Sequence, residues 1–322
     1  MSDEEKKNIF YVIDKSSGDM DNLAPYMDHV ISYMSFRHLL YTLAARVYVG
    51  SDSKKHLYIW RPKPNLISGK MKNKDIHFLQ HGVTALKKVD GIFGLHGSSP
   101  MTSITATSEY EQQIMTDHFG YSREQAPIVG FTRWDVLHDT SSEDDRIILV
   151  MPTWRAWLEE KTASDFLASD YFRNYMELLS DEGLQQSLSD NNVRLIFFIH
   201  PKFKDFLSQF SSPGDNVELV QFGSRPLNEI MMKCSMLITD YSSVCWDVYY
   251  MGKPVIFYQF DYDLYMENHG SYLDMENELF GDRFTELEDV IASVRSYIDC
   301  GFKESDRARE MRGKYFKYID EN

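Results

Sequence analysis

Short apolar runs rich in β-branched and aromatic residues recur along most of this chain, and helix-like stretches separate them. Most of the runs are continuously apolar rather than alternating, which is typical of strands that are covered on both faces. Strands that take turns with helices predict an α/β fold built on parallel sheets. The runs are NIFYVI (8–13), ARVYVG (45–50), DIHFLQ (75–80), ITAT (104–107), PIVGF (127–131), RIILVM (146–151), VRLIFFI (193–199), VELVQF (217–222), MLIT (236–239) and PVIFYQF (254–260), and helix-like stretches include 115–119, 170–181 and 227–234.

A polar stretch, TSSEDD at 140–145, divides the runs into two series. We place a domain boundary there, which gives an N-terminal domain at 1–141 and a C-terminal domain at 142–322. Each series has the strand–helix pattern of a Rossmann-like domain. Near the end of the chain, SDRAREMRGKYFKYI (305–319) indicates a basic helix. A solvated surface position and a role in binding a membrane surface or an acceptor both stay open for this helix.

Charge and cysteine content exclude several classes of function. The formal net charge of −15 argues against a general nucleic-acid binder, which needs a basic surface, although a small anionic ligand needs only local donors. The three cysteines are widely spaced and form no Cys-x-x-Cys pair, so neither a zinc ribbon nor a disulfide framework is supported. The sequence has neither a signal-peptide-like start nor an apolar run long enough to cross a bilayer. We therefore expect a cytoplasmic protein whose contact with the inner face of the cell membrane, if it has one, is peripheral.

Polar residues follow four of the expected strands directly. His81-Gly82 comes after 75–80, Pro152-Thr153-Trp154-Arg155 after 146–151, His200-Pro201-Lys202 after 193–199, and Asp240-Tyr241-Ser242-Ser243 after 236–239. Ligands of parallel α/β sheets bind beyond the carboxyl ends of the strands. These residues are therefore the first candidates for a site that binds phosphate and moves protons around it.

Residues 237–257, LITDYSSVCWDVYYMGKPVIF, read as a strand–helix–strand unit. Ser242 is a candidate N-cap, Gly252 suits the left-handed end of the helix, and Pro254 prevents its continuation. The free N–H groups of the helix start, together with small hydroxyls, make a seat for a diphosphate. Ordinary helix capping explains the same residues equally simply. The chain has no GxGxxG or Walker motif, so the usual dinucleotide and P-loop interpretations are not supported.

Two strand-end residues have a functional and a structural interpretation each. The guanidinium of Arg155 can grip two phosphate oxygens at once, or it can form a surface ion pair. The imidazole of His200 is held by the fixed φ angle of the following proline, and it is either a ligand-binding group or a structural histidine.

The stretch QHGVTALKK (80–88) has a similar ambiguity. Gly82 allows a sharp turn after His81 and a close approach of the backbone. Thr84, Lys87 and Lys88 add a hydroxyl and two cations, which suits an anionic partner or a solvated helix face.

Five motifs taken together resemble a known family. They are QHGVTALKK (80–88), IVGFTRWDVL (128–137), MPTWR (151–155), FIHPKF (198–203) and LITDYSSVCWD (237–247). Their order and spacing are similar to those of the CDP-glycerol:poly(glycerophosphate) glycerophosphotransferases and the related ribitol-phosphate polymerases. Those enzymes build wall teichoic acids of the bacterial cell wall and some capsules. The resemblance covers residues 80 to about 260 and extends more loosely to both ends.

The resemblance implies a GT-B fold, in which two Rossmann-like domains enclose an interdomain cleft. It implies an acceptor-side N-terminal domain and a C-terminal domain that binds the CDP-activated donor. His81 falls on the family's proposed catalytic base, and His200 on the histidine that contacts the donor phosphates. Thr239, Ser242 and Ser243 match the diphosphate-binding helix start, and Asp247 matches a carboxylate that we expect to accept hydrogen bonds from donor hydroxyls.

The complete set of expected site residues has three parts. The catalytic residues are His81 and His200. The donor-binding residues are Arg155, Thr153, Thr239, Asp240, Ser242, Ser243 and Asp247, and the acceptor-side residues are Gly82, Thr84, Lys87, Lys88 and Arg133.

The motifs depart from the family pattern at two prolines. The family usually reads His-Gly-Thr-Pro, where this chain has His81-Gly82-Val83-Thr84. It usually has Gly-x-Pro-Arg-x-Asp, where this chain has GFTRWD at 130–135. Without these prolines we expect looser loops on the acceptor side. Family members also continue through another helix, so we expect the catalytic part of a longer polymerase or a truncated chain.

The implied reaction is a phosphotransfer. A hydroxyl of a polyol-phosphate chain or a lipid-linked glycan attacks the β-phosphorus of CDP-glycerol or CDP-ribitol, and CMP leaves. His81 removes the hydroxyl proton, while His200, Arg155 and the helix start stabilise the developing charge. We expect no dedicated metal site and no required cofactor, and stimulation by Mg²⁺ stays open.

Two other functions stay open on the sequence. A GT-B glycosyltransferase that uses a nucleotide sugar would have the same fold and a similar phosphate site. A non-catalytic nucleotide-binding domain would need no base opposite the phosphate, and the combination of His81, Arg155 and His200 argues against it.

Overall fold

The computed structural model of this chain describes residues 6–52, 54, 69, 74–159, 161–210, 214 and 216–319. The backbone forms two compact units. The first unit comprises Met1–His81, Asp90–Thr105 and His118–Pro127, and the second comprises Gly82–Val89, Ala106–Asp117 and Ile128–Asn322. The chain therefore passes between the units several times, and the domain boundary expected after residue 141 stays a prediction.

The first unit contains two small parallel sheets. Its elements are β1 (Tyr11–Ile13), η1 (Gly18–His29), β2 (Val30–Ser32), α2 (Phe36–Ala44), β3 (Val47–Gly50), β4 (Asp75–Phe78), α4 (Asp90–Phe93) and β5 (Ser103–Ile104). β1 pairs with β2, and the other three strands have the order β3-β4-β5. Four of the expected runs thus contain strands, at 8–13, 45–50, 75–80 and 104–107.

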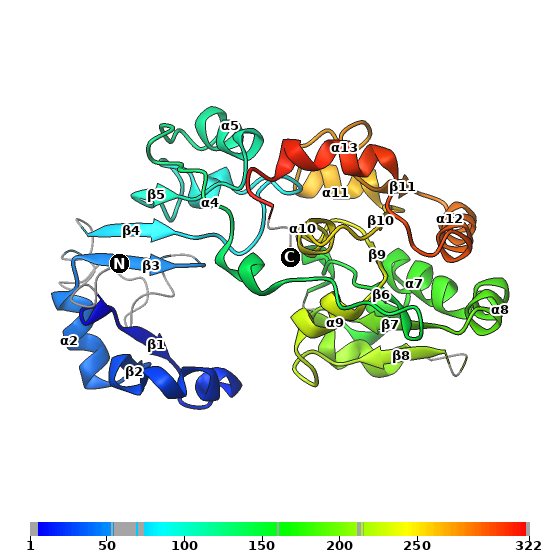
Figure 1. Cartoon of the computed structure of the whole chain (residues 1–322), viewed down its shortest axis with the longest axis horizontal. Helices are drawn as coiled ribbons and strands as arrows, with labels where there is room; N and C mark the ends of the chain where they lie inside the picture. Colours follow the sequence, from blue (N-terminus) through cyan, green and yellow to red (C-terminus); the bar gives the residue numbers. More distant parts are fainter. Residues whose placement is uncertain are drawn as a thin grey trace. The chain divides into compact units, whose positions relative to one another are not determined.

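The second unit is built on a parallel sheet of six strands in the order β11-β10-β9-β6-β7-β8 (Figure 1). These strands are β6 (Arg146–Val150), β7 (Val193–Phe198), β8 (Val217–Val220), β9 (Met236–Thr239), β10 (Val255–Tyr258) and β11 (Asp282–Phe284). Numbered from β6, this order is the 3-2-1-4-5-6 order of doubly wound nucleotide-binding sheets. The parallel α/β class expected from the apolar runs is therefore confirmed.

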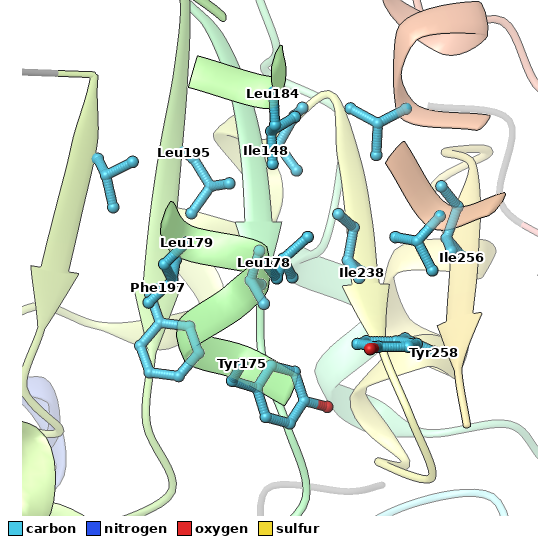
Figure 2. Packing of buried hydrophobic residues seen from close by; sticks show 14 of the residues in the cluster. Ile148, Tyr175, Leu178, Leu179, Leu184, Leu195, Phe197, Ile238, Ile256 and Tyr258 are labelled. Carbon is cyan, nitrogen blue, oxygen red and sulfur yellow. The ribbon is translucent and has the colours of Figure 1, made fainter. Parts of the chain in front are cut away.

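Helices cover both faces of this sheet. α7 (Asp170–Ser180), α8 (Glu182–Asp190) and α12 (Leu287–Asp299) pack on one face, and α9 (Leu227–Lys233) and α10 (Val244–Tyr250) on the other. Neighbouring residues of β6, such as Leu149 and Val150, are both fully buried. Coverage on both sides explains why the strands read as continuous rather than alternating apolar runs. Figure 2 shows the first face, where residues of α7 and α8 pack over strand residues, among them Leu178, Leu179, Leu184, Ile148, Leu195 and Ile238.

One expected strand is absent from the described residues, and two observed strands, β2 and β11, were not expected. Residues 127–131 form no strand within the part of the chain that the structure describes; Ile128 makes a single bridge to Ala106. Gly130 has a φ of +72°, a left-handed conformation that ends extended pairing there. β11 was not expected, because Asp282–Phe284 is a short edge strand without an apolar run.

The last helix that the structure describes, together with the residues after it, contacts residues 107–117 of the second unit. α13 (Asp306–Tyr315) packs against α5 (Glu109–Asp117). Lys317 donates its backbone N–H to the carbonyl of Thr107 at 2.9 Å, and the Thr107 hydroxyl oxygen lies 3.2 Å from the carbonyl oxygen of Tyr315. Basic side chains of this region form ion pairs with acidic neighbours, among them Arg309–Asp306, Arg312–Glu304, Lys314–Glu278 and Lys317–Glu109. This pairing favours the solvated surface helix of the two interpretations.

Within the described residues, no helix combines the length and the apolar character needed to cross a membrane.

Candidate functional site

The best candidate site lies where the strand order of the six-stranded sheet reverses. β6 and β9 are neighbours, and the chain leaves them towards opposite edges of the sheet, through β7 and β10. Such a reversal opens a crevice beyond the carboxyl ends of the two strands. Residues 152–155 follow β6 and residues 240–243 follow β9, so two of the expected motifs meet at this point.

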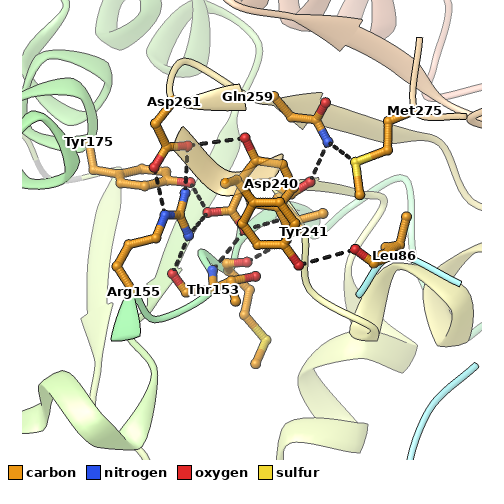
Figure 3. A network of polar contacts seen from close by, with 12 residues as sticks. Leu86, Thr153, Arg155, Tyr175, Asp240, Tyr241, Gln259, Asp261 and Met275 are labelled. Atoms are coloured by element: carbon orange, nitrogen blue, oxygen red, sulfur yellow. Dashed lines mark hydrogen bonds and ion pairs between the residues drawn. The ribbon is translucent and has the colours of Figure 1, made fainter. Parts of the chain in front are cut away.

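Arg155 is fully buried and lies at the centre of a network of polar contacts at the ends of these strands (Figure 3). Its Nη1 lies 2.8 Å from Asp240 Oδ2 and 2.7 Å from the Thr153 carbonyl oxygen. Its Nε and Nη2 lie 2.7 and 3.0 Å from the two carboxylate oxygens of Asp261, which follows β10. Burial acts to lower the pKa of Arg155, but the carboxylates of Asp240 and Asp261 outweigh that effect and hold the pKa above its ordinary value.

This geometry corrects both interpretations of Arg155. The side chain is neither a surface ion pair nor positioned to grip a phosphate, because its donors are bonded to two carboxylates and a carbonyl. It ties together the carboxyl ends of three adjacent strands, β6, β9 and β10. Buried charges of this kind depend on one another, so removing Arg155 would leave the carboxylates of Asp240 and Asp261 without their cation.

Thr239 and Asp240 also hold the sheet rather than a ligand. The Thr239 hydroxyl donates to the carbonyl of Met151 at 2.6 Å, which joins β9 to the end of β6. Asp240 accepts hydrogen bonds from the backbone N–H of Thr153 at 2.8 Å and from the Tyr175 hydroxyl at 3.0 Å. Both residues are fully buried. Their expected role in donor binding is therefore replaced by a role in fixing the strand ends.

Three hydroxyls of the expected set remain available at the crevice. Ser243 is exposed and its side chain makes no capping hydrogen bond, and Ser242 is half-buried and weakly accepts the Val244 N–H at 3.4 Å. The Thr153 hydroxyl is buried and has no hydrogen-bond partner among the described residues. A buried hydroxyl without a partner is costly, and a bound anion would supply the missing acceptor.

The helix that follows these serines begins one residue later than the sequence predicts, while its end has the predicted conformation. α10 begins at Val244, with Ser243 as its N-cap residue, one position later than expected. It ends at Tyr250, and Gly252, just beyond the cap residue Met251, has a φ of +79°, which is the left-handed conformation expected there. Because the helix has only seven residues, its dipole adds less than a long helix would, and the serine hydroxyls are the more important donors.

Gly82 packs directly on Ser243. A β-carbon at position 82 would lie 2.7 Å from the Ser243 hydroxyl oxygen and 2.8 Å from its β-carbon, which is closer than non-bonded atoms approach. Both residues belong to the second unit. Glycine at this position therefore lets the backbone that follows His81 reach the helix start, which confirms the close approach expected from the His-Gly pair.

The rest of segment 82–89 is anchored to the same unit. The carbonyl of Ala85 accepts the backbone N–H of Tyr272 at 2.9 Å, and the Tyr272 hydroxyl accepts the N–H of Val89 at 2.9 Å. The N–H of Lys88 bonds to the carbonyl of Gly270 at 3.2 Å. These bonds hold the segment against residues 270–272, which runs against the expectation of a loosened loop.

His81 itself is oriented by a backbone carbonyl of the first unit. Its Nδ1 lies 2.9 Å from the carbonyl oxygen of Ser51, and the ring is exposed. A carbonyl oxygen only accepts, so Nδ1 carries the proton in this hydrogen bond. The neutral ring is left with an unprotonated Nε2, which is the form that a general base requires.

His200 has the opposite tautomer. It precedes η5 (Pro201–Gln209), and its Nδ1 accepts the backbone N–H of Lys202 at 3.2 Å, so the neutral ring carries its proton on Nε2. Burial, with a smaller effect of Lys202, lowers the pKa of His200 to about 4. The ring is therefore neutral near pH 7 and acts as a hydrogen-bond donor rather than as a cation.

Trp154 lies beside two lysine side chains and the neutral ring of His200. The ring centre lies 5.8 Å from Lys87 Nζ, 5.5 Å from Lys202 Nζ and 6.0 Å from the His200 ring. Cations are attracted to the face of an indole ring at such distances. Lys202 also pairs with Glu159. Sequence reasoning missed the role of Trp154 and Lys202, although both stand in the quoted motifs beside residues that it chose.

The whole chain, residues 1–322, matches the family model described as CDP-Glycerol:Poly(glycerophosphate) glycerophosphotransferase. This chain belongs to that family. It is 29% identical over 326 residues to the minor teichoic acid biosynthesis protein GgaB of Bacillus subtilis (strain 168), which covers 97% of this chain and 35% of GgaB. It is 28% identical over 258 residues to the teichoic acid poly(ribitol-phosphate) polymerase of Bacillus spizizenii, covering 70% of this chain and 38% of that protein.

The chain thus spans little more than a third of the length of these glycerophosphotransferase-family relatives. Among solved structures, the wall teichoic acid polymerase TagF aligns with a TM-score of 0.65 at 16% identity, over 91% of this chain and 73% of that one. At this identity the likeness shows a shared fold.

Segment 130–135, where the chain has GFTRWD, is also held in place by side-chain hydrogen bonds. Arg133 and Trp134 both donate to Asp247 Oδ1 on α10, from Nε at 2.9 Å and from the indole nitrogen at 2.6 Å. Trp134 stacks on Tyr250 with ring centres 4.5 Å apart. Burial raises the pKa of Asp247, and Arg133 and Trp134 act against that shift. Asp247 and Arg133, expected to contact donor and acceptor, are therefore bonded to each other within the second unit.

Proposed function

We propose that this chain transfers glycerol phosphate or ribitol phosphate from its CDP-activated donor to a hydroxyl of a teichoic-acid-like or capsular polymer and releases CMP. The observation that carries the proposal is the contact between Gly82 and Ser243. It joins the backbone next to a base-competent histidine, His81, to a helix start that offers free hydroxyls beside a cationic cluster.

The donor diphosphate is bound in the crevice beyond β6 and β9. The hydroxyls of Thr153, Ser242 and Ser243 donate to its oxygens, and the Nε2–H of His200 adds a neutral donor. Lys87 and Lys202, both beside Trp154, supply the positive charge. The hydrogen bonds and charge interactions of these groups become stronger as negative charge develops on the leaving CMP.

The transfer is an in-line displacement at the β-phosphorus. The acceptor oxygen forms a bond to that phosphorus, and the bond from phosphorus to the bridging oxygen of CMP breaks. The proton of the acceptor hydroxyl goes to Nε2 of His81, while Nδ1–H stays on the Ser51 carbonyl. The imidazolium that forms is stabilised by the same hydrogen bond that oriented the ring.

We assign a GT-B arrangement to the chain, with two Rossmann-like domains, an interdomain cleft and an acceptor-side first unit. The strand order of the second unit and the likeness to TagF support this assignment. The acceptor is a polyol-phosphate chain end or a lipid-linked glycan, so the protein works in the cytoplasm at the inner face of the membrane through a peripheral contact. The reaction needs no resident metal, and Mg²⁺ acts at most as a stimulant.

CMP release tests the proposal. The folded protein is incubated with CDP-glycerol or CDP-ribitol and a polyol-phosphate primer, with and without EDTA, and CMP is measured. We expect release with one donor, abolished by His81→Ala while donor binding stays intact. A folded sample that releases no CMP from either donor would overturn the proposal, and stabilisation by a nucleotide sugar alone in a thermal-shift screen would favour a glycosyltransferase.

A further inference from the structure

A buried carboxylate stands behind the histidine segment. Glu111 lies on α5 and is fully buried. Its Oε1 accepts the backbone N–H of Thr84 at 2.6 Å, and its Oε2 accepts both the backbone N–H and the hydroxyl of Thr107, at 2.7 and 2.9 Å. Hydrogen bonds to an ionised carboxylate are about twice as strong as those between neutral groups. Glu111 therefore fixes the backbone of segment 82–89 strongly at one point.

That point is close to the reacting end of the segment. Thr84 is three residues beyond His81 in the sequence, and between them lies Gly82, which is packed on Ser243. A displacement of the backbone at Thr84 moves Gly82, for which there is no spare space, and the peptide that joins it to His81. Glu111 thus acts on the histidine through the chain and has no need to touch it.

The same position carries the departure from the family motif. A proline at position 84 would have its φ angle fixed by its ring and would have no N–H to satisfy. Thr84 has a freer φ angle and an N–H that lies inside the protein. The carboxylate of Glu111 both restrains this backbone and accepts the additional N–H, so it performs the two tasks that a proline ring makes unnecessary.

We infer that Glu111 is a positioning residue for the transfer reaction, which replaces the rigidity of the motif's proline by a hydrogen bond to the backbone of Thr84. The inference rests on the proposed function, in which His81 is the base. It concerns the rate of proton transfer and not donor affinity, because the groups around Trp154 hold the donor.

Three variants separate this role from a general contribution to stability. Glu111→Gln keeps the shape of the side chain but removes the charge and places an NH₂ group against an N–H donor. Thr84→Pro removes the backbone donor, and the double variant combines both changes. Ile114→Ala is the matched control, because Ile114 is buried on the same helix and its loss destabilises α5 without touching this hydrogen bond.

We expect Glu111→Gln to lower kcat about 10- to 100-fold with an unchanged KM for the donor, since a small misplacement of a reacting group has effects of this size. Adding Thr84→Pro to Glu111→Gln should restore much of the rate, because the proline needs no acceptor. Ile114→Ala should lower the midpoint of thermal unfolding while kcat, measured well below that midpoint, stays near the wild-type value.

Two results would overturn the inference. One is a loss of kcat in Glu111→Gln no greater than that in Ile114→Ala, and the other is a double variant no faster than Glu111→Gln.

Amide hydrogen exchange gives a readout that does not depend on activity: Glu111→Gln should speed exchange at Thr84 more than at Lys88, whose N–H bonds to Gly270. If wild-type protein releases no CMP but Glu111→Gln still speeds exchange at Thr84 more than at Lys88, the proposed function is refuted and the anchoring stands. If Glu111→Gln changes exchange at Thr84 and Lys88 equally, the anchoring is refuted. If Glu111→Gln does not fold, Thr84→Pro alone should keep turnover near the wild-type rate, because the proline ring restrains the backbone and Glu111 keeps its two bonds to Thr107. A loss of rate of about tenfold or more in folded Thr84→Pro would overturn the inference.

Discussion

Gly82 lies so close to Ser243 that a β-carbon on Gly82 would come within 2.7 Å of the serine hydroxyl oxygen. The contact joins two motifs that are far apart in the sequence, and it leaves no room for any other residue at position 82. It also places the backbone next to His81 at the start of α10.

Gly82→Ala should therefore lower the rate of CMP release about 10- to 100-fold, because the segment must shift to admit the methyl group. Adding Ser243→Gly removes both atoms that the methyl group would meet and should recover part of the rate. Gly91→Ala is the matched control, since a β-carbon there has open space around it and the φ angle is ordinary. Equal rates for Gly82→Ala and the control would contradict the importance of this contact.

Arg155→Met should destabilise the protein by about 3–5 kcal/mol, because it leaves the buried carboxylates of Asp240 and Asp261 without their cation. The free energy of unfolding in urea measures this loss. Arg194→Met is the comparison, because Arg194 pairs with Asp145 on the surface and should cost less than about 1 kcal/mol. A stable Arg155→Met variant that fails to bind CDP-glycerol would instead support the phosphate-gripping role that the sequence suggested.

Stability should fall as the pH drops from about 6.5 to about 4, in part through His200. Burial, with a smaller effect of Lys202, lowers the pKa of His200 from 6.5 to about 4 in the folded protein. In that window the unfolded chain binds a proton that the folded ring resists, so protonation favours unfolding. Above pH 6.5 both states carry a neutral ring and the effect is absent. Unfolding free energies measured across this range should depend less on pH in His200→Gln, and an unchanged slope would show that His200 does not contribute.

Lys202→Met should weaken binding of CDP-glycerol about tenfold, which corresponds to about 1.4 kcal/mol. The loss should shrink at high salt, because screening weakens exposed charge interactions. Glu159→Gln is the control, since it removes the carboxylate that pairs with Lys202 and leaves the cation beside Trp154. Calorimetric titration at low and high salt measures both variants. A weakening of the same size in Glu159→Gln would mean that the ion pair, and not the cation, matters.

The strands of the second unit could be predicted because their apolar runs are long and continuous. β6, β7, β9 and β10 all lie inside such runs, and only the edge strand β11, with its charged residues, escaped detection. That the motifs after β6 and β9 meet could also be predicted from the sequence, since the carboxyl ends of parallel strands lie at the same edge of a sheet.

The roles of individual residues were harder to predict, because partners distant in sequence decide them. Arg155 follows a strand as a phosphate ligand would, but Asp261, 106 residues later, takes its guanidinium. Asp261 directly follows the expected apolar run 254–260, which contains β10, so the same rule applied once more would have placed it beside Asp240. Nothing in the local sequence of α5 indicates that Glu111 accepts the Thr84 N–H, because that contact depends on tertiary packing.

Thr107 and Lys317 lie far apart in the sequence, yet the Thr107 carbonyl accepts the N–H of Lys317, and the Thr107 N–H bonds to the carboxylate of Glu111. Removing α13 and the residues that follow it would therefore release α5 and loosen segment 82–89. The placement of the His-Gly motif thus depends on a helix that none of the family motifs includes.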